Sequence, residues 1–178
     1  MQNYNRGIIE EFRVNEGRVG GPFAGAPMVL VTSTGANSGR LHTTPLVYLR
    51  EDDASGGPGE RIYVFGSMGG APNHPAWYHN LKAHPDATVE VGTDRYPVRA
   101  TIMTGEERDR LFEKQASLRP QFAEYQQRTT RKIPVIALEP PLRRGHAFAL
   151  VVIFQAHGQA ERPQMDKEQE VSPVEARV

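Results

Sequence analysis

The chain has 178 residues, of which 38% are apolar and 24% charged, with 21 Lys and Arg against 21 Asp and Glu. This length suits one domain with a true hydrophobic core, and the zero net charge argues against a protein that binds nucleic acid by neutralising phosphates. The absence of cysteine excludes disulfides, thiolate zinc sites and thiol nucleophiles.

Strand-like segments dominate the chain. Residues 92–95 (Gly-Thr-Asp-Arg) have the turn chemistry of a hairpin between two of them. Because most links are short, the pattern predicts an antiparallel barrel or sandwich and not alternating βαβ units. The six segments with apolar, β-branched composition are residues 27–32, 43–50, 61–66, 87–91, 96–103 and 133–138.

Helices are fewer and short. Thr104 and Glu107 have the spacing of a capping box, and Leu111, Phe112 and Leu118 follow on one helix face. The predicted helices lie around residues 8–12, at 76–83 with Pro75 in the first turn, from 104 to about 118, and at 120–128.

The end of the chain changes character. Residues 148–154 (FALVVIF) are an apolar run typical of one more strand. From about residue 155 the sequence is polar and has no periodicity. We therefore expect a single domain over residues 1–154 and a disordered tail over residues 155–178.

Two glycine-rich turns follow predicted strands, at residues 33–39 (STGANSG) and 66–70 (GSMGG). Such turns can point successive backbone N–H groups at a phosphate. Neither is a Walker loop, and neither matches the dinucleotide fingerprint, which needs a βαβ setting. The plainer alternative is that glycine only supplies positive φ in tight turns.

Other chemistry-bearing patterns are weak. His74, His79 and His84 are five residues apart, or about 140° on a helix, so they do not share a face and no metal site is expected. No GxSxG motif is present, and Ser67 is the only conspicuous hydroxyl.

Trp77 and Tyr78, close to Asn80, could present an aromatic wall to a flat ligand, although Trp77 and Leu81 could equally anchor the helix on the barrel. The basic stretch formed by Arg119, Arg128, Arg131 and Lys132 is either a solvated face or a contact for an anionic ligand.

An ordered set of short motifs covers roughly residues 5–140. These motifs are residues 8–15, 19–23, 33–39, 44–48, 69–72, 74–81, 125–131 and 133–135. In this order and spacing they resemble the deazaflavin-dependent nitroreductase and quinone reductase family. The resemblance implies a mainly β (α+β) fold, a split β-barrel of the flavin-reductase type with a few short helices. It also implies an oxidoreductase that passes a hydride from reduced coenzyme F420, with FMN as the alternative cofactor, to a quinone, nitroaromatic or activated enone.

The resemblance also implies site residues. The two turns would hold the phosphate and the deazaflavin edge, and the helix after the second turn would line that pocket. Ser67 and Tyr125 would orient the acceptor or donate a proton. The implied cofactor-binding residues are Thr34, Gly35, Ser38, Gly39, Arg40, His42, Gly66, Ser67, Met68, Gly69, Trp77, Tyr78 and Asn80.

The chain departs from the family at its phosphate-binding positions. The family commonly has basic residues in the first turn and the following strand, and a lysine in the second turn. This chain has Ala36, Asn37, His42 and Met68 there. Arg40, Lys82 and residues 128–132 are the candidates that could compensate. The departure keeps a second hypothesis open, a non-catalytic carrier for another flavin, a haem-like group or an apolar ligand on the same barrel.

Expectations about partners follow from the same features. No apolar run reaches the ~18 residues that span a bilayer, and residues 1–17 lack the apolar core of a secretion signal. We therefore expect a cytoplasmic protein with a small-molecule acceptor, no nucleic-acid partner and no integral membrane segment. The resemblance also allows a homodimer.

Overall fold

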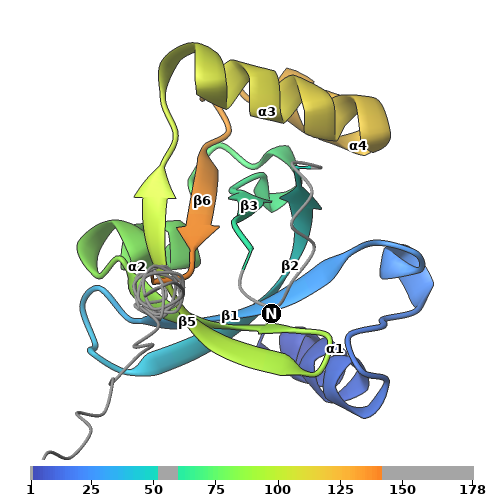
Figure 1. Ribbon diagram of the computed structural model, residues 1–178. Helices are drawn as coiled ribbons and strands as arrows, with labels where there is room; N and C mark the ends of the chain where they lie inside the picture. The colour runs from blue at the N-terminus through green and yellow to red at the C-terminus, as the bar shows by residue number, and fades with distance from the viewer. Residues whose placement is uncertain (1, 52–59, 142–178) are drawn as a thin grey trace, which may run out of the picture. The chain divides into compact units, whose positions relative to one another are not determined.

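The computed structural model of the protein describes residues 2–51 and 60–141, and its six strands close into an antiparallel barrel in the order β1-β2-β3-β6-β5-β4 (Figure 1). The split-barrel prediction is confirmed, as are all six strands in the described ranges. The predicted strand at 148–154 and the tail lie outside the described residues, so the predicted domain limits stay predictions. The elements are α1 (Gln2–Val14), η1 (Gly21–Phe23), β1 (Met28–Thr34), β2 (Leu41–Arg50), β3 (Ile62–Phe65), η2 (Met68–Gly70), α2 (Ala76–Ala83), β4 (Asp86–Val91), β5 (Asp94–Ile102), α3 (Gly105–Leu118), α4 (Gln121–Gln127) and β6 (Val135–Glu139).

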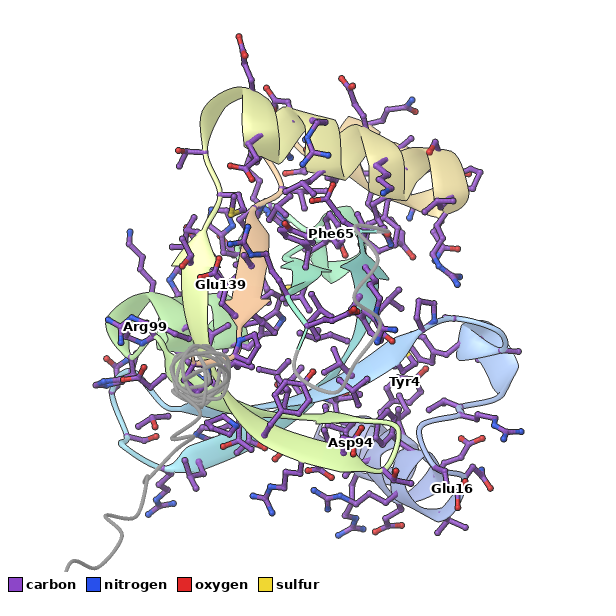
Figure 2. All side chains as sticks on the ribbon, viewed as in Figure 1. Tyr4, Glu16, Phe65, Asp94, Arg99 and Glu139 are labelled. Carbon is purple, nitrogen blue, oxygen red and sulfur yellow. The ribbon has the colours of Figure 1, made fainter. Side chains whose placement is uncertain are left out.

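Strand β3 is buried on both faces, which explains why it is apolar throughout. Side chains alternate across a strand, so Ile62 and Val64 join one hydrophobic cluster with residues of β1, β4, β5 and β6. Tyr63 and Phe65 join a second cluster with α3 and α4. Figure 2 shows Phe65 below these two helices, and its ring lies 5.5 Å from that of Phe122.

Helix α1 packs against the barrel through a third cluster. Ile8 and Phe12 are buried there with Met28 and Leu30 of β1. The helix is longer than the predicted core around residues 8–12, since it begins at Gln2. Its first turns are thereby fixed beside β2.

Strand β2 changes partners along its length. Residues 41–47 pair with β1, whereas residues 48–50 pair with β3. Among the described strands, the second edge of residues 41–47 is therefore unpaired. Pro45 lies in this stretch, opposite Leu30, as expected of a proline that has no N–H to donate.

Two local predictions in α3 are wrong. Thr104 occupies the N-cap position but makes no side-chain capping hydrogen bond. A capping box needs right-handed helical residues directly after the cap, and Gly105 instead has φ of +61°. Leu118 is not on the buried face, because its side chain is 64% exposed at the last helical position.

In the ranges that the structure describes, no helix is long and apolar enough to span a bilayer.

Candidate functional site

Two adjoining pockets lie along the unpaired edge of β2. The first, here the turn pocket, has a volume of about 720 Å³ and is bounded by the loop at residues 35–38, β2 at 41–44, α1 and α2. The second, here the aromatic pocket, has a volume of about 450 Å³ and is bounded by β2 at 44–47, residues 67–69 and α4. Asn5, Thr44, Ala76 and Trp77 line both pockets, so they join into one continuous site.

The first glycine-rich turn forms the floor of the turn pocket. It is closed by hydrogen bonds from Gly35 N–H to the Arg40 carbonyl (2.7 Å) and from Gly39 N–H to the Gly35 carbonyl (2.9 Å). Ser38 Oγ accepts the Arg40 N–H at 3.3 Å and lies 3.4 Å from His42 Nε2. In the described part of the chain, the N–H groups of Asn37 and Ser38 make no hydrogen bond. They are therefore available to an anionic ligand.

Glycine is required at position 35 for a packing reason. A Cβ there would collide with Ser38 Oγ and lie 3.0 Å from His42 Nε2. The space that a side chain would fill is thus taken by the two polar groups that face the pocket. This crowding is specific to position 35, because a Cβ at Gly39 of the same turn would meet nothing within 4 Å.

Asn80 holds the turn from helix α2. Its Oδ1 accepts the Ala36 N–H at 2.9 Å, and its Nδ2 donates to Ser33 Oγ at 3.4 Å. The side chain is only 8% exposed, and the amide is satisfied by protein groups. Asn80 therefore positions the turn, although it also lines the pocket.

The second glycine-rich turn is held by Arg131. This side chain donates to the carbonyls of Ala71 (2.8 Å) and Ser67 (2.9 Å) and to Nδ1 of His74 (3.1 Å). Since a guanidinium can only donate, Nδ1 of His74 is unprotonated. Burial, followed by the charges of Arg131, His79 and Lys82, lowers the pKa of His74. Burial also lowers the pKa of Arg131.

The aromatic pocket carries no charged residue among the described residues that line it. Its walls include Phe65, Trp77, Phe122 and Tyr125. Tyr125 is half-buried and packs edge-on against Phe122, with 5.7 Å between ring centroids. Ser67 and Thr44 add further hydroxyls to the same lining. Such a pocket suits a flat, neutral ligand with a polar edge.

The structure brings together nine of the residues proposed from the sequence. Trp77 belongs to the barrel core, as one interpretation expected, and it also lines both pockets, while its contact with a flat ligand stays a prediction. The turn pocket receives Gly35, Ser38, His42 and Asn80, and the aromatic pocket receives Ser67, Met68, Gly69 and Tyr125. Their roles in binding and catalysis stay predictions.

Five proposed residues do not line these two pockets: Thr34, Gly39, Arg40, Gly66 and Tyr78. Tyr78 instead packs on His74, with ring centroids 4.7 Å apart. Gly66 is needed for close packing, because a Cβ there would lie 2.7 Å from Pro134 Cγ.

Most of the cations expected to replace the family's basic phosphate-binding residues do not face the turn pocket. Arg131 is directed at the second turn, and Lys132 bonds Asp109 at 2.9 Å. Arg128 lines neither pocket. Sequence reasoning missed Asn5 and Arg6, which α1 brings to the turn pocket.

This fold and site define a split β-barrel reductase of the flavin-reductase type, with one pocket at a glycine-rich turn and an adjoining pocket lined by aromatic side chains. Comparison with protein families is more specific. The chain belongs to the F420H(2)-dependent quinone reductase family, whose model matches residues 4–140.

Individual relatives agree. An F420H(2)-dependent quinone reductase of Mycobacterium tuberculosis (strain H37Rv) is 38% identical over 134 residues, covering 71% of this chain and 83% of the relative. A solved F420-H2 dependent reductase, FDR-A, is 38% identical with a TM-score of 0.55, covering 64% of this chain and 94% of that one. A structure described as a domain-swapped dimer is 34% identical with a TM-score of 0.57, covering 78% and 98% respectively.

Proposed function

We propose that this F420-dependent oxidoreductase reduces a quinone, or a similarly flat and electron-poor nitroaromatic or enone, bound in the aromatic pocket. The carrying observation is that the pocket that contains the glycine-rich turn and Arg6 meets an uncharged aromatic pocket at Trp77, Thr44 and Ala76. One compartment suits the polar, anionic end of the coenzyme, and the other suits a neutral acceptor. Their junction is where the deazaflavin ring would meet the acceptor.

The residues present fit the coenzyme. The free N–H groups of Asn37 and Ser38 form a cradle that would hold a phosphate in the turn pocket. Asn80 fixes this cradle from α2. Trp77 would line the ring site at the junction of the two pockets.

When bound, the reduced coenzyme supplies a hydride, which carries the two electrons of the reduction and one proton. A quinone also needs a hydrogen-bond donor at the oxygen where negative charge develops, and a proton to complete the hydroquinone. The hydroxyls of Tyr125 and Ser67 line the acceptor pocket and would meet this need. The uncharged lining would exclude water from the reacting atoms.

The carrier hypothesis is not favoured, because the family and the relatives point to F420-dependent reduction. FMN stays as the competing ligand that an experiment must exclude.

The test is a fluorescence titration of the purified protein with oxidised F420, in parallel with FMN, followed by turnover of reduced F420 with menadione. We expect saturable F420 binding, weaker or absent FMN binding, and quinone reduction. Tyr125→Phe should reduce turnover about 10- to 100-fold, the range typical of removing a proton donor or oxyanion partner. Tyr4→Phe, at an exposed tyrosine of α1, is the matched control. Binding without turnover would favour a carrier, and no F420 binding would overturn the proposal.

We further propose that the protein forms a homodimer in the cytoplasm. The 34%-identical structure described as a domain-swapped dimer supports the first part. Light scattering on the purified full chain would give the oligomeric state, and cell fractionation would give the location. A monomer at all concentrations, or recovery outside the cytoplasmic fraction, would contradict them.

A further inference from the structure

We infer that Arg6 of α1 is the cation that binds the anionic end of the coenzyme and selects phosphorylated deazaflavins over neutral ones. The inference rests on the proposed function. Arg6 lines the turn pocket together with Asn37, Ser38 and His42. Among the described residues that line it, Arg6 is the only Lys or Arg, and none is Asp or Glu. A pocket with one guanidinium and no carboxylate favours an anion.

The guanidinium of Arg6 is available to a ligand. Its side chain is 73% exposed, and its contact with Glu10 Oε1 is 4.0 Å from Nε. An exposed i,i+4 pair at this distance is weak and is screened by salt. A phosphate can therefore displace it, since arginine binds phosphate through two parallel N–H donors.

Arg13, on the same helix, is instead bound firmly to a carboxylate. Its Nε and Nη2 donate to the two carboxylate oxygens of Glu90 at 2.9 and 2.7 Å. Arg13 does not line the turn pocket. The helix thus carries one committed arginine and one arginine free to meet a ligand, which provides a matched pair for experiment.

The backbone of Arg6 is held in place by the barrel. Ile8 and Phe12 are buried against β1, so α1 is anchored within two residues of Arg6. Only the side chain then has to be ordered on binding, which lowers the entropic cost of the contact. Asn5, the preceding residue, lines both pockets and continues the same wall.

The two pockets differ in charge, and this difference would set which ligand each pocket binds. The turn pocket has Arg6, and the aromatic pocket has no charged lining residue among those described. The phosphate and the tail carboxylates of the coenzyme would therefore lie in the turn pocket. The neutral acceptor would lie in the aromatic pocket, so one arginine would prevent the reverse orientation.

The experiment is a set of fluorescence titrations of wild type, Arg6→Gln, Arg6→Lys, Glu10→Gln and Arg13→Gln. The probes are F420 and the neutral deazaflavin nucleoside fragment that lacks the phosphate. We expect Arg6→Gln to raise the Kd for F420 about 10- to 100-fold and to change the Kd for the neutral fragment less than about twofold. Arg6→Lys should fall between, and Glu10→Gln should tighten F420 binding.

Arg13→Gln is the control and should leave the F420 Kd unchanged, with circular dichroism confirming that each variant is folded. Raising the salt concentration should weaken F420 binding to wild type more steeply than to Arg6→Gln. Repeating the titration with F420 that keeps its phosphate but lacks the glutamate tail assigns the contact. A retained penalty identifies the phosphate, and a lost penalty identifies the tail carboxylates.

Two outcomes would overturn the inference and can be told apart. In the first outcome, wild type binds F420, and Arg6→Gln either binds F420 equally well or loses as much affinity for the neutral fragment as for F420. Arg6 is then not the anion contact, and the proposed function stands. If wild type does not bind F420 at all, the proposed function fails and the inference fails with it.

Discussion

The side-chain oxygen of Asn80 accepts a hydrogen bond from the backbone N–H of Ala36 at 2.9 Å, which ties helix α2 to the first glycine-rich turn across 44 residues of sequence. Because the amide of Asn80 is buried and also donates to Ser33 Oγ, the conformation of the first glycine-rich turn is set by a helix that lies outside the turn. The neighbouring free N–H groups of Asn37 and Ser38 are thereby preorganised, so they would lose little entropy on binding an anion.

Asn80→Ala should therefore affect both stability and coenzyme binding. It leaves the Ala36 N–H without its acceptor, so we expect the free energy of unfolding to fall by about 1–3 kcal/mol. The Kd for F420 should rise several-fold because the turn loosens. Urea denaturation and fluorescence titration measure the two effects. Asn73→Ala, at an exposed asparagine just before α2, is the control; equal stability of the two variants would refute the assignment.

Much of the fold could be predicted from local sequence. The β-branched runs gave the strands, and Gly92 with its neighbours gave the β4–β5 turn, because both depend on nearest-neighbour backbone preferences. The glycine turns were found for the same reason, since tight turns have their own residue requirements.

The remaining features depend on contacts between distant residues. Arg131 was expected either on a solvated face or in contact with an anionic ligand, yet it bonds the Ser67 carbonyl 64 residues away. Arg6 carries no motif and reaches the pocket only because Ile8 and Phe12 dock α1 on β1. The failed capping box at Thr104 reflects a positive φ at Gly105, which composition does not reveal.

Removing Arg131 should impair the acceptor site more than the coenzyme site. Its bonds to the carbonyls of Ser67 and Ala71 fix the turn that carries Ser67 into the aromatic pocket. We expect Arg131→Ala to lower kcat/KM for menadione about 10-fold or more, while the F420 Kd changes little. Lys132→Ala, at the exposed neighbour that pairs with Asp109, should leave both unchanged. A loss of F420 affinity as large as the loss of kcat/KM would show that Arg131 acts on the whole site.

Gly69 and Gly70 provide a matched pair for the packing of α4 on the second turn. Both have positive φ, +64° and +83°, so alanine strains the backbone at either by about 1–2 kcal/mol. A Cβ at Gly69 meets nothing within 4 Å, whereas one at Gly70 would lie 2.7 Å from the Tyr125 carbonyl oxygen. Gly70→Ala should thus destabilise the protein by about 1–3 kcal/mol more than Gly69→Ala. Thermal unfolding of the two variants decides, and equal melting temperatures would be inconsistent with this contact.

His74 should make stability depend on mildly acidic pH. Burial and the positive charge of Arg131 lower its pKa in the folded protein, and its Nδ1 accepts a hydrogen bond from Arg131. Below the ordinary histidine pKa of about 6.5, the unfolded chain binds a proton that the folded protein does not. The free energy of unfolding therefore falls as pH drops from about 6.5 to the lowered pKa of His74, and is fully retained above that window.

The measurement is urea denaturation at a series of pH values between about 7.5 and 5, the range in which histidines titrate. His74→Asn should flatten the pH dependence relative to wild type, because the group that titrates differently in the two states is gone. His84→Asn, at an exposed histidine that follows α2, should keep the wild-type slope. If His74→Asn retained that slope, the contact with Arg131 would not control the acid sensitivity of the fold.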